Sequence, residues 1–243
     1  MTPDNNLAQI WVYLSASPLL GLTITLIAYG LAYRVYVWAQ FNPLLNPVVT
    51  AVGLLIALLL LTNTPYQDYF AGGQFVHFLL GPATVALAIP LYRQFGKLKT
   101  LWLPVLVALL VGVTVGGGSA VGIAWLLGAD AQTLLSLAPK SVTAPVAMGI
   151  AERVGGIPSL TAVLVVMTGI VGAVFGTKLF DLMRIRDDSV RGIAMGVAAH
   201  GIGTARAFQV SAEMGAFAGL AMALSAFVAS VLLPWLLGWI RWV

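Results

Sequence analysis

Long runs of apolar residues, separated by short polar loops, organise this chain from end to end. A bilayer-spanning helix needs about 20 predominantly apolar residues, and eight hydrophobic segments of about that length or more can be drawn. They span residues 9–31, 44–61, 73–93, 100–127, 132–153, 158–180, 189–210 and 213–241. The pattern predicts an all-α integral membrane protein, a polytopic helical bundle.

The fifth segment is interrupted at its centre. The sequence SLAPKSVTAPVAMGIAERVGG contains two prolines around a polar stretch, and its interrupting residues are Pro139, Lys140, Ser141, Thr143 and Pro145. Proline lacks a backbone donor and breaks a helix when it lies in the interior. We therefore expect an unwound turn at about residues 138–143 in place of a continuous helix.

A short helix is predicted after this turn. It should begin at about Ala144, with Thr143 as its N-cap and Pro145 in its first turn, and end at Gly155-Gly156. About ten residues give a length of roughly 15 Å, half the thickness of the hydrocarbon core. The positive N-terminal end of the helix would then lie near the midplane beside Lys140. Transporters bind anionic substrates at such places.

Two basic loops predict the topology. Residues 93–99 carry Arg93, Lys97 and Lys99, and residues 184–191 carry Arg184, Arg186 and Arg191. Short loops rich in Lys and Arg lie on the cytoplasmic side, so the fourth segment leaves that side and the sixth returns to it. The fifth segment must then enter the membrane and come back, or cross it only in part. The fourth segment contains Gly116-Gly117-Gly118 and is expected to bend or break there.

The seventh segment repeats the theme of the fifth. His200-Gly201-Ile202-Gly203 is flexible, Thr204 can cap a helix, and a short helix that carries Arg206 is expected to end at Gly215. Thr143-Ala144 and Ala151-Glu152 match Thr204-Ala205 and Ala212-Glu213, each pair 61 positions apart. A weaker third copy is Gly81-Pro82-Ala83-Thr84. Internal, inverted repeats with interrupted helices are typical of secondary transporters.

Composition narrows the class of protein. Of 243 residues, 60% are hydrophobic and 8% charged, whereas soluble domains carry about a quarter charged residues. The absence of cysteine and the presence of only two histidines argue against a metal site, and we expect no cofactor. The net charge of +4 is spread over short loops, which fits membrane topology and not nucleic acid. Without an HExxH motif or paired apolar-segment aspartates, the chain is predicted not to be an enzyme.

Lys140 and Arg206 are the first candidates for a binding site. A cation at the centre of a membrane helix costs about 2.5–3.5 kcal/mol on insertion scales, so each needs water, a partner or a ligand. One interpretation is that both contact an anionic substrate. The other is snorkelling or a buried ion pair, for example Lys140 with Glu213.

The remaining candidates each have two interpretations. The hydroxyl groups of Ser141, Thr143 and Thr204 can donate hydrogen bonds to a carboxylate, and either threonine can also cap its helix. His200 can relay protons near neutral pH or be an interior histidine with satisfied nitrogens. Glu152 and Glu213 can couple protons or ions to transport, or lie at the membrane interface.

Several motifs closely resemble the LrgB/CidB family. They are PKSVTAPVAM, GGIPSLTAV, the TGIVGAVFG run and HGIGTARAF, together with GPATVALAIPLY at residues 81–92, which is similar to the N-terminal family motif. The resemblance covers the chain from about residue 40 to its end and implies one transmembrane domain over residues 1–243. The family motifs fall on the three interrupted sites and add Gly81 and Thr84 to the candidate substrate-binding residues.

The resemblance implies two functions. Relatives that include a plastid glycolate/glycerate translocator imply a carrier of small monocarboxylates such as glycolate, glycerate, pyruvate or 3-hydroxypropionate. The alternative is an antiholin-like regulatory subunit that modulates murein hydrolase activity and autolysis. A small LrgA/CidA-type membrane protein is the implied partner, and the bacterial inner membrane is the implied location. A homo-oligomer is a further possibility, whereas a nucleic-acid partner is not expected.

The topology can be tested by cysteine labelling, because the chain contains no cysteine of its own. Single cysteines at Lys97 and Arg186 should react with a membrane-impermeant reagent from the cytoplasmic side, and a cysteine at Asp130 should react from the opposite side. Labelling of positions 97 and 186 from opposite sides would rule out a fifth segment that enters and returns.

Overall fold

The computed structural model describes residues 18–42, 45–79, 82, 85–86 and 88–239. These residues form helices and connecting turns, without strands. Within them, four helices are long and apolar enough to cross a membrane: Leu19–Trp38, Phe95–Leu126, Pro158–Leu182 and Ala212–Gly238. The predicted class, a helical membrane protein, is confirmed, while the division into eight segments stays a prediction. The chain forms two compact units, Met1–Ala86 and Leu87–Val243.

The first unit contains α2 (Pro18–Trp38), α3 (Pro47–Leu61) and α4 (Tyr66–Phe78). Asn46 caps α3, since its side-chain oxygen accepts a hydrogen bond from Val48 N at 2.9 Å. Gly21 lets α2 approach α4 closely, because an added Cβ would collide with the Tyr69 carbonyl oxygen. The hydroxyls of Thr25 and Tyr69 also share a hydrogen bond of 2.9 Å. Small residues therefore set this packing, as is common between membrane helices.

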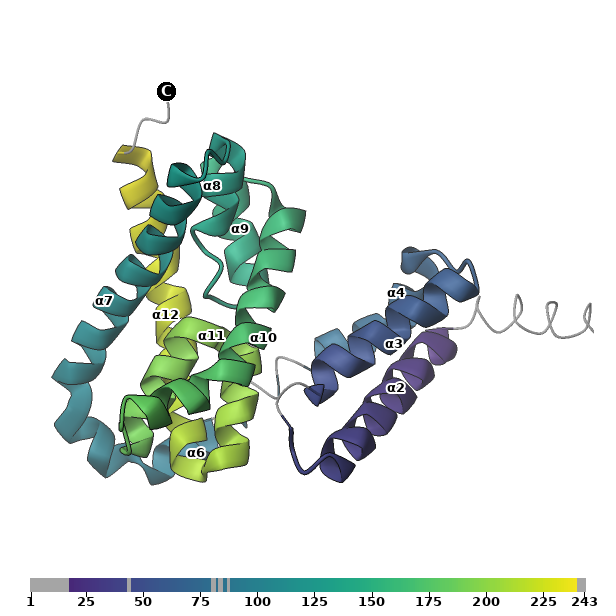
Figure 1. Cartoon of the computed structure of the whole chain (residues 1–243), viewed down its shortest axis with the longest axis horizontal. Helices are drawn as coiled ribbons and strands as arrows, with labels where there is room; N and C mark the ends of the chain where they lie inside the picture. The colour runs from purple at the N-terminus through teal and green to yellow at the C-terminus, as the bar shows by residue number, and fades with distance from the viewer. Residues whose placement is uncertain (1–17, 43–44, 80–81, 83–84, 87, 240–243) are drawn as a thin grey trace, which may run out of the picture. The chain divides into compact units, whose positions relative to one another are not determined.

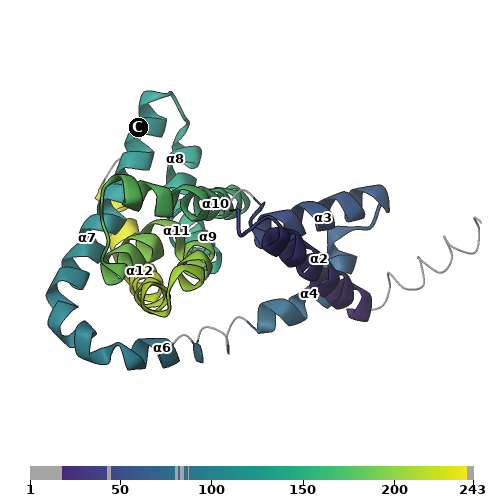
Figure 2. The same ribbon diagram turned by 60° about the horizontal axis from the view of Figure 1, so that its bottom comes forward.

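The second unit contains the candidate site. Its helices are α6 (Ala88–Arg93), α7 (Phe95–Leu126), α8 (Ala131–Leu137), α9 (Ala144–Val154), α10 (Pro158–Leu182), α11 (Asp188–Val210) and α12 (Ala212–Trp239) (Figure 1). In the turned view, α7 curves along one side of the unit while α9 to α12 gather beside it (Figure 2). Phe217 and Ala221 of α12 are fully buried and belong to the main apolar core.

α7 is one continuous helix of 32 residues, so the break predicted as one possibility at Gly116-Gly117-Gly118 is wrong. Its buried positions recur every four residues, at Val105, Leu109, Val113, Gly117 and Val121, as one helical face requires. A Cβ on Gly117 would lie 3.0 Å from the Ala138 carbonyl oxygen. The turn at residue 138 packs directly on α7, and this close approach explains the glycine at position 117.

α8 and α9 form the first of two fold-backs. Ile157 N, just after α9, donates a hydrogen bond of 2.7 Å to Ser136 Oγ near the end of α8. Thr161 Oγ1 donates to the Ser136 carbonyl oxygen at 2.9 Å. A straight helix would separate residues 136 and 157 by about 31 Å. The chain therefore reverses between α8 and α9, in agreement with a fifth segment that enters and returns.

α9 follows the prediction closely. It starts at Ala144 with Thr143 in the N-cap position and Pro145 in the first turn, and it ends at Gly155, whose φ of 88° is left-handed. Residues 138–143 are turn and bend, as expected. One detail differs: the Thr143 side chain makes no capping hydrogen bond, so its hydroxyl does not serve as the cap that the sequence predicted.

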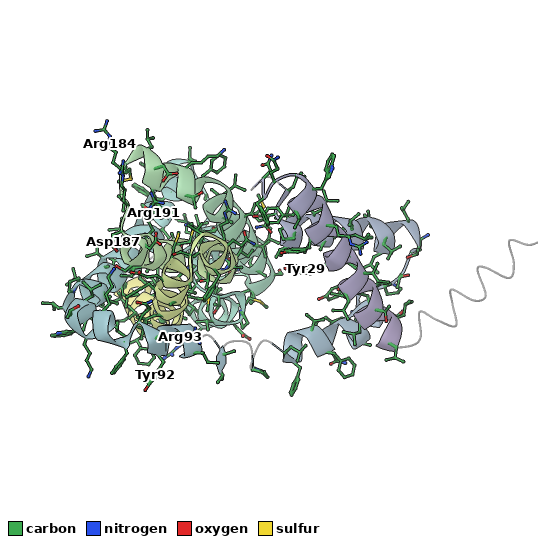
Figure 3. The ribbon with its side chains drawn as sticks, turned by 90° about the horizontal axis from the view of Figure 1, so that it is seen from below. Tyr29, Tyr92, Arg93, Arg184, Asp187 and Arg191 are labelled. Atoms are coloured by element: carbon green, nitrogen blue, oxygen red, sulfur yellow. The ribbon has the colours of Figure 1, made fainter. Side chains whose placement is uncertain are left out.

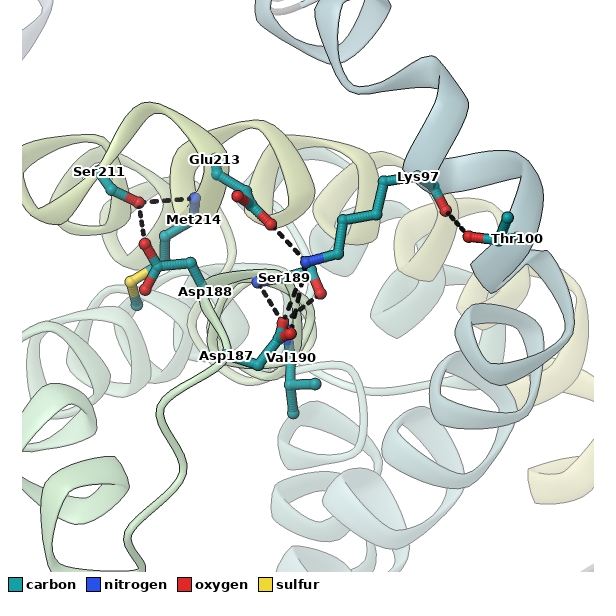
Figure 4. A network of polar contacts seen from close by, with 9 residues as sticks. All are labelled: Lys97, Thr100, Asp187, Asp188, Ser189, Val190, Ser211, Glu213 and Met214. Atoms are coloured by element: carbon teal, nitrogen blue, oxygen red, sulfur yellow. Dashed lines mark hydrogen bonds and ion pairs between the residues drawn. The ribbon is translucent and has the colours of Figure 1, made fainter.

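α11 forms the second fold-back. It runs for 23 residues, and a straight helix of that length would measure about 34 Å. However, Ser211 Oγ donates a hydrogen bond of 2.6 Å to Asp188 Oδ2 (Figure 4), so the two ends meet. The reversal occurs at Ala199 and His200, whose backbone angles are not helical. A Cβ on Gly203 would lie 3.1 Å from the Met195 carbonyl oxygen, so the two arms pack against each other.

Two details predicted for this segment are wrong. Thr204 does not cap a helix, because its hydroxyl donates to the His200 carbonyl oxygen at 2.8 Å within α11. The second arm ends at Val210, and Ser211 separates it from α12, so the stop is not at Gly215. Gly215 lies in the first turns of α12, where a side chain would collide with the Phe208 ring. Gly215 is therefore explained by close packing against Phe208 and not by the end of a helix.

Close approach of α11 and α12 can be tested with a pair of glycine substitutions. A Cβ on Gly196 would collide with the Ala218 carbonyl oxygen, whereas a Cβ on Gly122 would have no atom within 4 Å. We expect Gly196→Ala to destabilise the protein by about 1–3 kcal/mol, because the backbone of α12 must shift. Gly122→Ala, also within a helix, should be neutral or stabilise by about 0.5–1 kcal/mol. Thermal unfolding in detergent measures both, and equal midpoints would contradict this packing.

Candidate functional site

The turn between α8 and α9 places Lys140 and Ser141 inside the second unit. Pro139 is fully buried, and Ala138 and Val142 are each 3% exposed. Backbone hydrogen bonds from Lys140 N to Leu137 O (3.1 Å) and from Val142 N to Pro139 O (3.2 Å) fix the turn. These three apolar residues of the turn are buried, whereas Lys140 and Ser141 are only half-buried.

Lys140 has a hydroxyl neighbour and, among the described residues, no carboxylate partner. Its Nζ donates a hydrogen bond of 3.3 Å to Ser141 Oγ. Among the residues described, no carboxylate lies within ion-pair distance of it. The ion pair that the sequence offered as an alternative does not form, since Glu213 pairs with Lys97 at 2.6 Å. The contact that Lys140 makes within the described part of the chain is therefore a hydrogen bond to a neutral hydroxyl group.

A cavity of about 650 Å³ opens onto Lys140 and Ser141. One face of α7, from Leu101 to Ser119, forms one wall, and the first arm of α11, from Ser189 to Ala198, forms the other. Lys140 is the charged residue of this lining. Gly116 faces the turn closely enough that an added Cβ would lie 3.8 Å from Ser141 Oγ. The arrangement can hold one small anion beside Lys140 in a largely apolar cavity.

The second reversal lies against α10. The ring nitrogen Nε2 of His200 is 2.8 Å from the Val165 carbonyl oxygen, and the side chain is 5% exposed. Gly169 provides the space for the ring, because a Cβ there would lie 2.7 Å from His200 Cε1. This environment is that of an interior histidine held by the main chain.

The other candidates do not line the cavity. Arg206 is half-buried in the second arm of α11, where Nη1 donates to Gln209 Oε1 at 3.1 Å. Thr204 is buried beside His200, and Thr143 begins α9. Glu152 is exposed in the last turn of α9. Gly81 and Thr84 lie outside the described residues.

A charge network that sequence reasoning missed joins three elements (Figure 4). Lys97 Nζ, at the start of α7, lies 3.4 Å from Asp187 Oδ2 and 2.6 Å from Glu213 Oε1 of α12. Asp187 caps α11, because its Oδ1 accepts hydrogen bonds from the backbone of Ser189 (2.9 Å) and Val190 (3.1 Å) and from the Ser189 hydroxyl. An Asp-Asp-Ser sequence before a helical run is a typical N-cap pattern and was the available signal.

This network brings the two basic loops to the same end of the unit, as the charge pattern predicted. Figure 3, which views the molecule from this end, shows Arg184, Asp187 and Arg191 on neighbouring parts of the chain. Arg191 also ties the second loop together, since its guanidinium contacts Asp181 Oδ1 and the Ile185 carbonyl oxygen, each at 2.5 Å. α7 then leads away from this end, so Asp130 after it lies at the opposite end. The membrane side of either end remains a prediction.

Long apolar helices and two folded-back segments define a polytopic α-helical membrane protein. The chain belongs to the LrgB-like family, whose sequence pattern matches residues 25–239. It is 37% identical to the uncharacterized protein YwbG of Bacillus subtilis (strain 168) over 90% of this chain and 97% of that protein. It is 38% identical to the uncharacterized protein YxaC of the same organism over 79% and 84%. Identity to the antiholin-like protein LrgB of Bacillus mycoides (strain KBAB4) is 31% over 90% and 95%. No solved structure matches the chain.

The Asp187 network predicts a pH dependence. Hydrogen bonds from the Ser189 hydroxyl and the Val190 backbone, together with Lys97, lower the pKa of Asp187 from 3.8 to about 2. Because the folded-state pKa is depressed, the stabilisation is complete above about pH 4 and is lost as the pH falls towards 2. Asparagine is an equally good N-cap, so Asp187→Asn should remove mainly the charge. Its thermal midpoint should lie slightly below that of the parent at neutral pH, because surface pairs are weak, and should converge with it near pH 2.

Asp187→Ala provides the comparison that separates the charge from the cap. It should cost a further 0.5–2 kcal/mol or so at every pH, since the cap is lost as well. Thermal unfolding of the three proteins across this pH range measures both effects. If the difference between parent and Asp187→Asn does not change with pH, the ionised Asp187 is not what stabilises this end of the unit.

Proposed function

We propose that the chain is an antiholin-like membrane protein that modulates murein hydrolase activity and autolysis. Its family membership and its similarity to proteins named antiholin-like protein LrgB support this function. We propose that it acts in the bacterial inner membrane through a small LrgA/CidA-type membrane protein, with residues 1–243 as one transmembrane domain and a homo-oligomer as one possible assembly. Neither catalysis nor a cofactor is part of this proposal.

A second candidate function, carriage of small monocarboxylates, is favoured by one observation. Lys140 is a half-buried cation without a described carboxylate partner, and it faces a cavity. A lysine in that position is costly in a membrane, and a bound anion would offset the cost. We propose that glycolate, glycerate, pyruvate or 3-hydroxypropionate places its carboxylate between Lys140 Nζ and Ser141 Oγ.

The start of α9 supports the same site. Thr143 makes no capping hydrogen bond, and the first-turn N–H groups of a helix lack partners within that helix. The 11-residue helix directs its positive end towards the turn that carries Lys140. A carboxylate at Lys140 would therefore meet a point charge, a hydroxyl donor and a favourable helix dipole.

We propose that the two fold-backs are the cores of an inverted repeat. The first begins after the α7 end that is remote from Lys97, and the second begins at Asp187, which Lys97 contacts. They therefore enter the unit from opposite ends, as paired broken helices do in secondary transporters. In this scheme His200, Thr204 and Arg206 form the second half of the pathway, Gly81 and Thr84 belong to a third interrupted site, and Glu152 and Glu213 couple ions.

Flux measurements separate the two functions. In proteoliposomes, the parent should take up labelled glycolate or pyruvate saturably, with or without the small partner protein. Lys140→Met should insert at least as well, because removal of the cation lowers the insertion cost by about 2–3 kcal/mol, but should lose tenfold or more of the uptake. Lys99→Met is the matched control, since Lys99 is exposed and outside the cavity, and should behave as the parent. If no preparation shows saturable uptake, the carrier function is rejected and only the regulatory function is left.

Regulation is tested in a bacterial host that lacks its own LrgB-like genes. Expression of the parent together with the small partner should lower the rate of autolysis and the murein hydrolase activity seen on zymograms. Omission of the partner should abolish the effect. If autolysis is unchanged by the pair, the antiholin-like proposal fails, whatever the flux assay gives. If Lys140→Met still regulates autolysis, carriage and regulation are independent.

A further inference from the structure

The lining of the Lys140 cavity restricts the anion that it can hold. From one turn beyond Leu101 to Gly116, the α7 wall presents Pro104, Ala108, Val111, Gly112 and Val115. The facing arm of α11 presents Val190, Ile193, Ala194, Val197 and Ala198. All of these side chains are apolar or absent. Beyond the carboxylate position, the cavity therefore offers no side-chain hydrogen-bond partner over most of its length.

The polar groups of the lining gather at the two ends. Lys140 and Ser141 form the head of the cavity, and Ser119 lies one turn beyond Gly116 on the same face of α7. Ser189, at the far end, donates its hydroxyl hydrogen to Asp187. A ligand with its carboxylate at Lys140 thus meets only apolar surface along the remainder of its chain.

Because the cavity has one cation and apolar walls, it should discriminate between anions by their charge and by the polarity of their chains. A second carboxylate would lie against valine and alanine side chains without a counter-charge, which is strongly unfavourable. A hydroxyl group far from the carboxylate would lose its water without gaining a partner. A methylene or methyl group in the same position gains from burial.

We infer that this site takes monocarboxylates with an unsubstituted apolar chain in preference to acids that carry a hydroxyl beyond the third carbon or a second carboxylate. The inference rests on the proposed monocarboxylate site at Lys140. It sharpens the substrate class of that site, because affinity should rise with chain length beyond the smallest acids. Burial of a methylene corresponds to an increase in affinity of about fourfold.

The test is calorimetric titration of the full chain in nanodiscs of zwitterionic lipid. Acetate, propionate, butyrate and valerate should bind progressively more tightly, by about fourfold per methylene. Two matched acids probe the wall: 4-hydroxybutyrate replaces the terminal methyl of valerate by a hydroxyl, and glutarate adds a second carboxylate to the same number of carbons. Each should bind about tenfold or more weakly than valerate.

Cavity-filling variants establish where the chain lies. Ala194→Leu and Val115→Phe enlarge exposed side chains of the two walls, so both should weaken valerate by about tenfold or more and leave acetate nearly unchanged. Ala223→Leu enlarges an exposed alanine of α12 that is not part of this lining and should leave the whole series unchanged. Lys140→Met should abolish binding of every acid.

The outcomes distinguish failure of the apolar-chain preference from failure of the proposed monocarboxylate site at Lys140. A flat series, or 4-hydroxybutyrate as tight as valerate, overturns the apolar-chain preference, while loss of binding in Lys140→Met still supports the anion site. A methylene increment that persists in Lys140→Met and in both cavity-filling variants reflects partition into lipid and also overturns the inference. Absence of binding by any acid to the parent overturns the Lys140 site itself.

Discussion

Each reversal of the chain inside an apolar protein exposes backbone groups that need hydrogen-bond partners, and this requirement governs the second unit. Lipid offers no donors or acceptors, so the protein must supply them. At the first fold-back, Ser136 accepts from Ile157 N through its hydroxyl and from Thr161 through its carbonyl oxygen. At the second, Thr204 donates to the His200 carbonyl and the His200 ring contacts the Val165 carbonyl. Single polar side chains thus stabilise both broken segments.

Glycine completes these arrangements by removing side chains where main chains must meet. Gly117 lets the turn at Ala138 rest on α7, Gly169 makes room for the His200 ring, and Gly196 brings α11 against α12. Membrane helices associate without a hydrophobic driving force between them, so close backbone approach has to supply van der Waals contact. The broken segments are therefore held by small residues on the continuous helices around them.

Two lysines on neighbouring elements show how position decides the role of a charge. Lys97, at the end of α7, is neutralised by Asp187 and Glu213 and joins three elements at one end of the unit. Lys140, in the turn between α8 and α9, contacts a hydroxyl and faces a cavity. The first cation is part of the structure that closes one end. The second remains available for a ligand, and the proposals on anion binding depend on that difference.

Part of the site could be predicted from the sequence, because residues close together in the chain determine the turn that carries Lys140. Prolines around Lys140, the N-terminal position of Thr143 and the stop at Gly155-Gly156 predicted the turn and the approximate bounds of α9, which the structure confirms. Charge counts alone predicted that the basic loops lie together and that the fifth segment returns. Motif spacing was less reliable at the second reversal, where the sequence predicted Thr204 as a helix cap and Gly215 as a helix end. Instead, Thr204 donates a hydrogen bond to the His200 carbonyl oxygen, and Gly215 makes room for the Phe208 ring.

By itself, the sequence determined the membrane class, the family and the location of two chain interruptions, near residues 138–143 and at His200, because hydropathy, proline and glycine act on the local backbone. Only the tertiary structure decided which polar residues face a shared space. Lys140 and Ser141 line one cavity, whereas Arg206, Thr204 and His200 face other parts of the unit. It also decided the partner of Glu213, which is Lys97, 116 positions away. Such pairings depend on how distant helices pack, and no local pattern specifies them.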